Sequence, residues 1–185
     1  NTPVFSFSKL RTVDISLSPE MKSTGEVMAT DTNYKAALKK SLTASGIVMP
    51  PIGNVLFSLA DRDKTEGLQI ARALIRRNYK ILATDKTYEY FQKNNLNCQL
   101  VKKADLIKRL REKNDIDMFI TTATIGKDKL RPGFRVRRTA MEFNIPCITS
   151  LDTANAVIFA FTGISKEDIL PLNKYGVRRE AENEI

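Results

Sequence analysis

Five short apolar segments alternate with stretches of helical periodicity from residue 54 onward, and this alternation constrains the fold more than any other feature. The apolar segments are residues 54–60, 80–84, 98–101, 118–122 and 147–150. They lack the polar alternation of strands that have one wet face, so we expect strands covered on both faces, as in parallel sheets. The alternating order predicts an α/β fold built on a doubly wound, five-stranded parallel sheet.

Apolar residues at helical spacing mark the segments between these strands. They are Leu68, Ala71, Leu74 and Ile75, then Leu106, Ile107 and Leu110, then Val136, Ala140, Met141 and Phe143. Asp63 followed three residues later by Glu66 predicts a capping box at the start of the first helix. A helix over 151–163 is expected to close the domain, and the polar end from residue 173 is expected to be a tail.

The first 52 residues have a different character. Residues 1–32 mix Ser, Thr, Pro and Asp with single apolar residues and show no sustained helical period, so we expect an extended strap. A short helix is predicted over 34–42, and Pro50 and Pro51 forbid its continuation. The sequence therefore predicts a domain boundary near residue 52.

Composition removes several classes of function. The chain contains no histidine, which excludes Ser-His-Asp and Cys-His catalysis and His-ligated zinc. Cys98 and Cys147 lie far apart and outside any CxxC spacing, so we predict no metal site and expect two small buried residues in a reducing cytoplasm. The longest apolar stretches are far shorter than the ~20 residues that span a bilayer, which argues against a membrane partner.

The formal net charge of +9 predicts a surface that attracts anions. Nucleic acid, phosphorylated small molecules and acidic protein faces all fit this charge. Gly-rich nucleotide loops of the GxGxxG or GxxxxGK type are absent from the sequence, which disfavours dinucleotide and P-loop nucleotide binding.

Hydroxyl and ammonium side chains recur just after the predicted strands. These loops contain residues 61–64, 84–87, 102–103, 121–124 with 126–127, and 149–150. Ligands of open parallel sheets bind at the carboxyl edge, where helix N-termini also favour anions, so the composition suits a phosphate or carboxylate. Each residue alone also fits an ordinary role, because Thr often caps helices and loop Lys is usually solvated. Arg137 and Arg138 fit ligand contact and plain helix decoration equally well.

Specific strings resemble a known family. PVFSFSKLR from Pro3, Val13-Asp14, and PEMKSTGEVM at 19–28 resemble the end of the second ATP-grasp unit of the carbamoyl-phosphate synthase large subunit. SLADRDK at 58–64, ATDKT at 83–87 and VRRTA at 136–140 resemble the allosteric domain that ends this subunit, a methylglyoxal-synthase-like fold. The resemblance assigns 1–32 to the tail of the ATP-grasp synthetic domain, 33–52 to a connecting helix and Pro-rich linker, 53–172 to the allosteric domain and 173–185 to a C-terminal tail.

The resemblance implies a regulatory domain that binds an effector such as UMP or IMP and controls ATP-dependent carbamoyl phosphate synthesis for pyrimidine or arginine pathways. The implied effector contacts are Lys64, Thr84, Thr87, Lys103, Thr121, Thr122 and Lys127, and Leu17 and Thr149 match contacts to ornithine. Thr121 stands where nucleotide-binding relatives carry Asn, and Cys147 replaces a Tyr of the ornithine site. The resemblance further implies no catalytic residue or cofactor in this stretch, a parent that uses ATP with Mg²⁺ or Mn²⁺, and as partners the rest of the large subunit and the glutaminase small subunit.

Two alternatives stay open. A phosphate lyase of the methylglyoxal synthase type is similar in fold, but its implied histidine and its Gly-Thr-Thr-Gly loop do not occur in this sequence. A basic nucleic-acid-binding module is motivated only by the net charge, without an aromatic platform or recognition helix to support it.

Overall fold

The computed structural model describes residues 1–5, 14–16, 25–112, 115–122 and 132–162. The chain divides into two compact units. The first unit comprises Asn1–Phe5, Lys22–Val48 and Ala156–Ile185, and the second comprises Ser6–Met21 and Met49–Asn155.

The second unit is built on a five-stranded sheet in which every neighbouring pair is parallel. Its strands are β3 (Asn54–Ser58), β4 (Lys80–Thr84), β5 (Gln99–Val101), β6 (Met118–Thr121) and β7 (Cys147–Ile148), in the order β5-β4-β3-β6-β7. The central strand β3 places Phe57 between Ala83 of β4 and Ile120 of β6. The predicted α/β fold with a parallel five-stranded sheet is confirmed.

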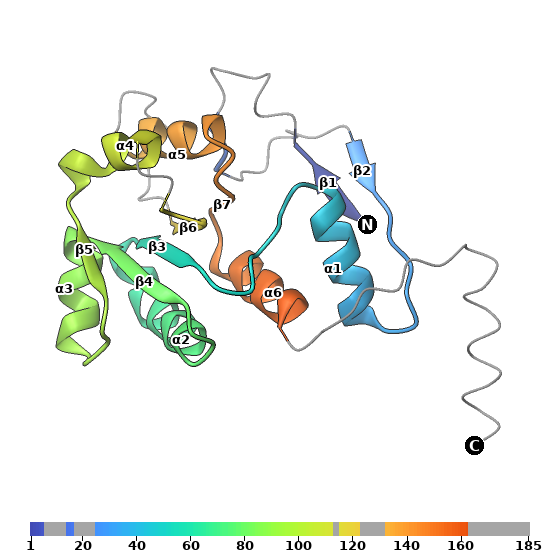
Figure 1. Ribbon diagram of the computed structural model, residues 1–185, viewed down its shortest axis with the longest axis horizontal. Coiled ribbons are helices and arrows are strands. Elements are labelled where there is room, and N and C mark those ends of the chain that lie inside the picture. The colour runs from blue at the N-terminus through green and yellow to red at the C-terminus, as the bar shows by residue number, and fades with distance from the viewer. Residues whose placement is uncertain (6–13, 17–24, 113–114, 123–131, 163–185) are drawn as a thin grey trace. The chain divides into compact units, whose positions relative to one another are not determined.

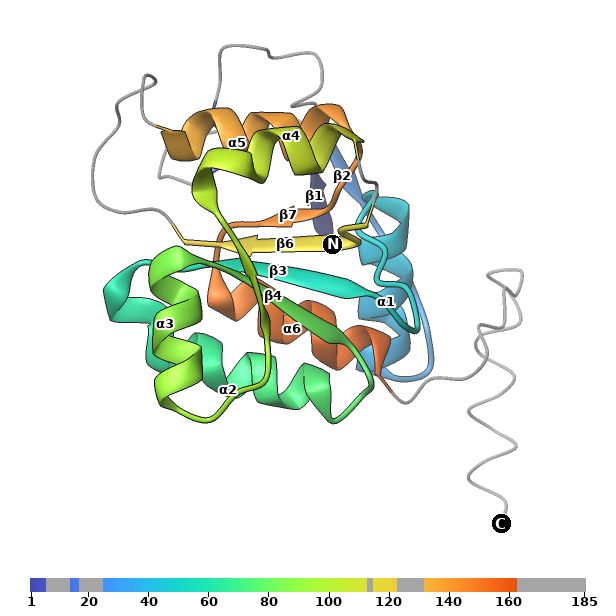
Figure 2. The same cartoon turned by 60° about the vertical axis from the view of Figure 1, so that its left-hand side comes forward.

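Helices cover both faces of this sheet because the chain winds outward from β3 in both directions. A 3₁₀ turn, η1 (Asp61–Asp63), leads into α2 (Lys64–Ile75), which lies with α3 (Asp85–Lys93) on one face (Figures 1 and 2). The other face is covered by α4 (Lys103–Glu112) and α5 (Pro132–Glu142). Right-handed crossover connections between parallel strands place the carboxyl ends of all these strands at one edge of the sheet.

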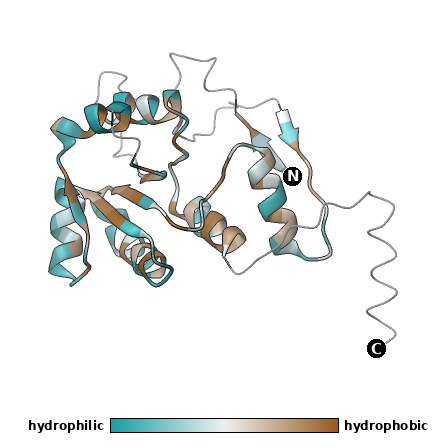
Figure 3. Cartoon of the chain, viewed as in Figure 1, coloured by the Kyte–Doolittle hydropathy of each residue, from teal (hydrophilic) through white to brown (hydrophobic). Residues whose placement is uncertain are grey.

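Successive residues of β3 supply the core on the two faces. Phe57 makes an edge-to-face contact with Phe91 of α3, with ring centroids 5.7 Å apart. Leu56 instead joins the cluster beneath α4 and α5, which includes Leu106, Phe119 and Ala140. In Figure 3 the strands carry much of the hydrophobic colouring, whereas α3 and α4 are largely hydrophilic. Each fully buried large side chain contributes about 1.5–3 kcal/mol to folding.

Three helices end in the same way, with an asparagine in the left-handed region. Asn78, Asn95 and Asn144 have φ angles of 65°, 57° and 54°. The amide after each asparagine donates to a carbonyl five residues back, as Tyr79 N does to Leu74 O, and the asparagine amide itself donates three residues back. This is the Schellman arrangement, in which Asn replaces the more usual Gly. We did not predict these endings from the sequence.

The predicted capping box at α2 is wrong. Asp63 occupies the N-cap position, but its side chain accepts no capping hydrogen bond. Its backbone is already helical, with φ −99° and ψ −4°, because η1 runs directly into α2, and a capping side chain needs an extended N-cap backbone. The Glu66 carboxylate instead accepts from Asn155 Nδ2 at 3.1 Å.

Phe143 does not face the core as its spacing suggested. It follows the last residue of α5 and is 45% exposed, because the chain turns there toward Asn144. Val136 and Ala140 of the same pattern are buried, so the prediction fails only at its end.

The first unit contains a small antiparallel pair and α1. β1 (Thr2–Val4) pairs with β2 (Gly25–Val27), and α1 (Tyr34–Ala44) starts at Asn33, whose side chain accepts from Ala36 N at 2.9 Å. Helix α1 is two residues longer than predicted. Thr2 Oγ1 donates to Ser41 Oγ of α1 at 2.8 Å.

Helix α6 (Leu151–Phe161) starts in the second unit and belongs to the first from residue 156 onward. Within the described part of the chain, no helix combines the length and the apolar character needed to cross a bilayer. The family-based domain boundaries at 32, 52 and 172 stay predictions.

Candidate functional site

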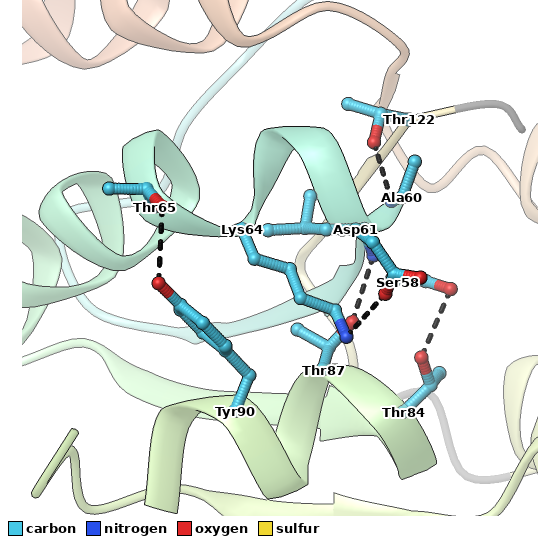
Figure 4. A network of polar contacts seen from close by, with 10 residues as sticks. Ser58, Ala60, Asp61, Lys64, Thr65, Thr84, Thr87, Tyr90 and Thr122 are labelled. Carbon is cyan, nitrogen blue, oxygen red and sulfur yellow. Dashed lines mark hydrogen bonds and ion pairs between the residues drawn. The ribbon is translucent and has the colours of Figure 1, made fainter. Parts of the chain in front are cut away.

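The candidate site lies at the carboxyl ends of β3, β4 and β6, which are neighbours in the sheet (Figure 4). Ser58 ends β3, Thr84 ends β4, and Thr121 ends β6. Thr87 lies in the first turn of α3, and Thr122 follows β6. The topology therefore brings the threonines expected from the sequence to one edge.

Two of these threonines hold the loop that follows β3. Leu59 N donates to Thr87 Oγ1 and Ala60 N donates to Thr122 Oγ1, both at 2.9 Å. Each hydroxyl uses a lone pair in this contact, but only Thr122 is partly exposed, since Thr87 is buried. Thr87 and Thr122 therefore both hold this loop, and the partly exposed Thr122 also has a hydroxyl hydrogen that suits an oxyanion.

The other two threonines direct their hydroxyls toward Ser58. Thr84 Oγ1 donates to Ser58 Oγ at 3.0 Å, and Thr121 Oγ1 donates to the Ser58 carbonyl at 3.0 Å. Thr84 and Thr121 are buried, so these bonds fix the strand ends relative to one another. Their donor hydrogens are already engaged within the protein.

Lys64, the first residue of α2, supplies a buried cation at this edge. Its ammonium lies 2.7 Å from Asp61 Oδ1 and 5.8 Å from the centre of the Tyr90 ring. Tyr90 is held in turn by its hydroxyl, 3.1 Å from Thr65 Oγ1. Figure 4 shows the Lys64 side chain turned toward Asp61. A cation that is mostly withdrawn from water requires an anionic or polar partner, and Asp61 is that partner here.

Further lysines act on Asp61. The hydrogen bond from Lys64 and then its charge hold the pKa of Asp61 below its usual value, against a small opposing effect of desolvation, and the charges of Lys86 and Lys103 add to this. Lys103 also uses its backbone, since Lys103 N donates to Asp85 Oδ2 at 3.0 Å and so ties the start of α4 to the start of α3.

Sequence reasoning missed the parts played by Asp61 and Asp85. The i,i+3 spacing of Asp61 and Lys64 was the available signal, but this spacing is common on exposed helical turns. The Asp85 contact joins residues 18 apart on different helices, which no local pattern indicates.

Other expected residues either have different partners or are not described by the structure. Thr149 directly follows β7, which is separated from β3 by β6. Leu17 and Lys127 are outside the described residues. Arg137 is buried, and two of its guanidinium nitrogens donate to the Asp14 carboxylate, with Nε 2.9 Å from Oδ1. Arg138 Nε donates to Glu142 Oε1 at 3.3 Å.

The two cysteines are partly buried, and their environment suppresses ionisation. Desolvation raises the pKa of Cys147 to about 12, despite the nearby charge of Arg137. Desolvation also raises the pKa of Cys98, and a contact from Gln92 opposes this. Both side chains are therefore neutral thiols near pH 7.

A doubly wound parallel domain with hydroxyl and ammonium donors at its carboxyl edge is a class of structure suited to anion binding. Residues 66–149 match the family model described as MGS-like domain. Thr84, Thr87, Lys103, Thr121 and Thr122 fall within the matched residues.

Among solved structures, the fold is similar to methylglyoxal synthase from Elizabethkingia anophelis NUHP1. The similarity has a TM-score of 0.48 at 12% sequence identity and covers 69% of this chain and 91% of that chain. A likeness this distant says nothing about activity.

Proposed function

We propose that this chain is a regulatory part of the carbamoyl-phosphate synthase large subunit, whose MGS-like domain binds the phosphate of a nucleotide effector such as UMP or IMP. The observation that carries the proposal is the buried Lys64 ammonium beside the hydroxyl-bearing ends of β3, β4 and β6. The strings at residues 3–28 and 58–64 support the choice of parent protein.

The chemistry of the edge favours a phosphate monoester over a neutral ligand. Such a group carries about −1.5 to −2 charges at pH 7 and three strong acceptor oxygens. Lys64 and the surface lysines Lys86 and Lys103 offer positive charge, and the partly exposed Thr122 offers a hydroxyl hydrogen. The start of α3 adds a partial positive charge, which also favours an anion.

The proposal extends to the parent's chemistry and partners. In it, ATP with Mg²⁺ or Mn²⁺ serves the synthetic domains outside this stretch, and the glutaminase small subunit and the remaining large subunit are the macromolecular partners. An ornithine contact through Leu17 and Thr149 belongs to the same proposal, as does a cytoplasmic setting.

We assign no catalysis to this chain itself. The lyase chemistry implied by the sequence resemblance to the methylglyoxal-synthase-like fold uses a carboxylate with histidine assistance, and the sequence contains no histidine. Formation of methylglyoxal from dihydroxyacetone phosphate by the purified protein would overturn this assignment.

Isothermal titration with UMP, IMP and inorganic phosphate tests the proposal. We expect binding to the folded chain, weakened at least about fivefold by Lys64→Ala or Lys103→Ala, which corresponds to the ~1 kcal/mol of one hydrogen bond. Lys80→Ala is the matched control, because it removes the same charge at the opposite end of β4.

Absence of binding to all three ligands would refute the phosphate site. Equal affinities of wild type, Lys64→Ala and Lys103→Ala would place the pocket elsewhere. A gel shift that persists at physiological salt would instead favour the nucleic-acid alternative, since non-specific phosphate contacts weaken steeply with salt.

A further inference from the structure

The ion pair between Lys64 and Asp61 is unequal in its exposure to water. The Lys64 side chain is 10% exposed, whereas that of Asp61 is 81% exposed. The cation is therefore fixed within the fold, while its counter-ion lies on the surface, 2.7 Å away.

This inequality makes Asp61 the mobile partner. Rotation about its side-chain bonds moves the carboxylate into water, where it is well solvated, and sacrifices one surface-type contact of small net value. Lys64 has no equivalent freedom, because it starts α2 and packs over the Tyr90 ring at 5.8 Å. A buried ammonium that loses one anion gains from taking another.

Asp61 is surrounded by more positive charge than its own single negative charge can neutralise. The Lys64 ammonium of α2 lies 2.7 Å from its carboxylate, and the positive charges of Lys86 of α3 and Lys103 of α4 also act on it. These three charges stay at the edge when the carboxylate leaves. An incoming phosphate then meets the positive charge that Asp61 partly neutralises in the free protein.

We propose that Asp61 is a displaceable counter-ion, which holds the Lys64 ammonium in the free protein, yields it to a phosphate-bearing ligand and thereby sets the anion selectivity of the site. The inference rests on the phosphate site proposed above. A carboxylate ligand that replaces Asp61 exchanges one monoanion for another and gains little. A phosphate monoester brings a second charge and a third oxygen, so it displaces Asp61 where simple carboxylates do not.

Titration of the full chain with inorganic phosphate, UMP and acetate tests this role. We expect Asp61→Asn to lower the Kd for phosphate and UMP about two- to fivefold, the range set by one ion pair with an exposed partner. We also expect it to make acetate a measurable competitor of phosphate. Asp61→Ser, which removes the carboxylate with a different geometry, should behave alike.

Glu112→Gln is the matched control, because it removes the same charge from an exposed residue paired with Lys108 at 4.0 Å on α4. Equal tightening by Asp61→Asn and Glu112→Gln would reduce the effect to net charge and overturn the inference. An unchanged Kd with a lowered melting temperature would reduce Asp61 to a helix-start residue and overturn it too.

The two proposals fail in different ways. If wild type binds phosphate and Lys64→Ala weakens it while Asp61→Asn changes nothing, only the counter-ion role is lost. If neither wild type nor Asp61→Asn binds any of the ligands, the phosphate site is lost and the counter-ion role falls with it.

Discussion

Replacing Thr87 by valine isolates the hydrogen bond that holds the loop after β3. Thr87 Oγ1 accepts from Leu59 N at 2.9 Å, and both residues are buried. Valine has nearly the same shape and is also β-branched, so Thr87→Val opens no cavity and changes the helix propensity of α3 little. The main effect is a buried amide without a partner.

The magnitude follows from that loss. An unsatisfied buried donor costs about 1–3 kcal/mol, and in a chain of this size each kcal/mol lowers the melting temperature by about 2–4 °C. We therefore expect urea denaturation followed by circular dichroism to show a loss of about 1–3 kcal/mol. Hydrogen exchange should show faster exchange of the Leu59 amide.

Two companion variants make the result specific. Thr87→Ser keeps the hydroxyl, so it should retain the slow exchange of Leu59 and lose only about 1 kcal/mol for the missing methyl group. Thr65→Val removes an exposed hydroxyl in the first turn of α2, and its effect should stay within about 0.5 kcal/mol. The reasoning is refuted if Thr87→Val is as stable as wild type and leaves Leu59 exchange unchanged.

The remaining predictions concern Asp14 and the two thiols. Asp14→Asn leaves the buried Arg137 guanidinium without its counter-charge, so we expect the free energy of unfolding in urea to fall by about 1–3 kcal/mol. The loss is smaller than for a fully buried pair because the Asp14 side chain is 32% exposed. An unchanged denaturation midpoint would contradict this prediction. A thiol ionises as the pH rises through its pKa, so Cys147, with a pKa near 12, should resist labelling by a thiolate-specific reagent in the native protein at pH 8 and react once urea unfolds it. Cys98 should label more slowly than a free thiol, and rapid native labelling of Cys147, located by mass spectrometry, would speak against its burial.

The sheet could be predicted from the sequence because its strands are short apolar runs that alternate with segments of helical periodicity. Strand β4 occupies the predicted residues 80–84. Strand β3 ends at Ser58 rather than at residue 60, because Leu59 and Ala60 donate to threonines 28 and 62 residues away instead of continuing the ladder. Strand β7 stops at Ile148 because α6 already begins at Leu151. Distant partners and the next element set these ends, and a local pattern contains neither.

The candidate site was predictable to the same extent. Parallel topology alone places Thr84, Thr87 and Thr122 at one edge, so their proximity follows from the order of elements. The hydrogen-bond partners of their hydroxyls do not follow from it. The structure shows that Arg137 pairs with Asp14. Asp14 lies 123 residues away in the sequence, so no local pattern indicates this contact.

The three asparagine endings lie at the opposite edge of the sheet from the candidate site, since each leads from a helix back into the amino end of a strand. Each return is specified by its own few residues, an asparagine followed by a buried apolar side chain such as Tyr79, Leu96 or Ile145. The loops at the candidate site can therefore change in sequence while these helix endings at the opposite edge keep the strands in place. Sequence change at one edge of the sheet is thus separated from the residues that fix the fold at the other edge.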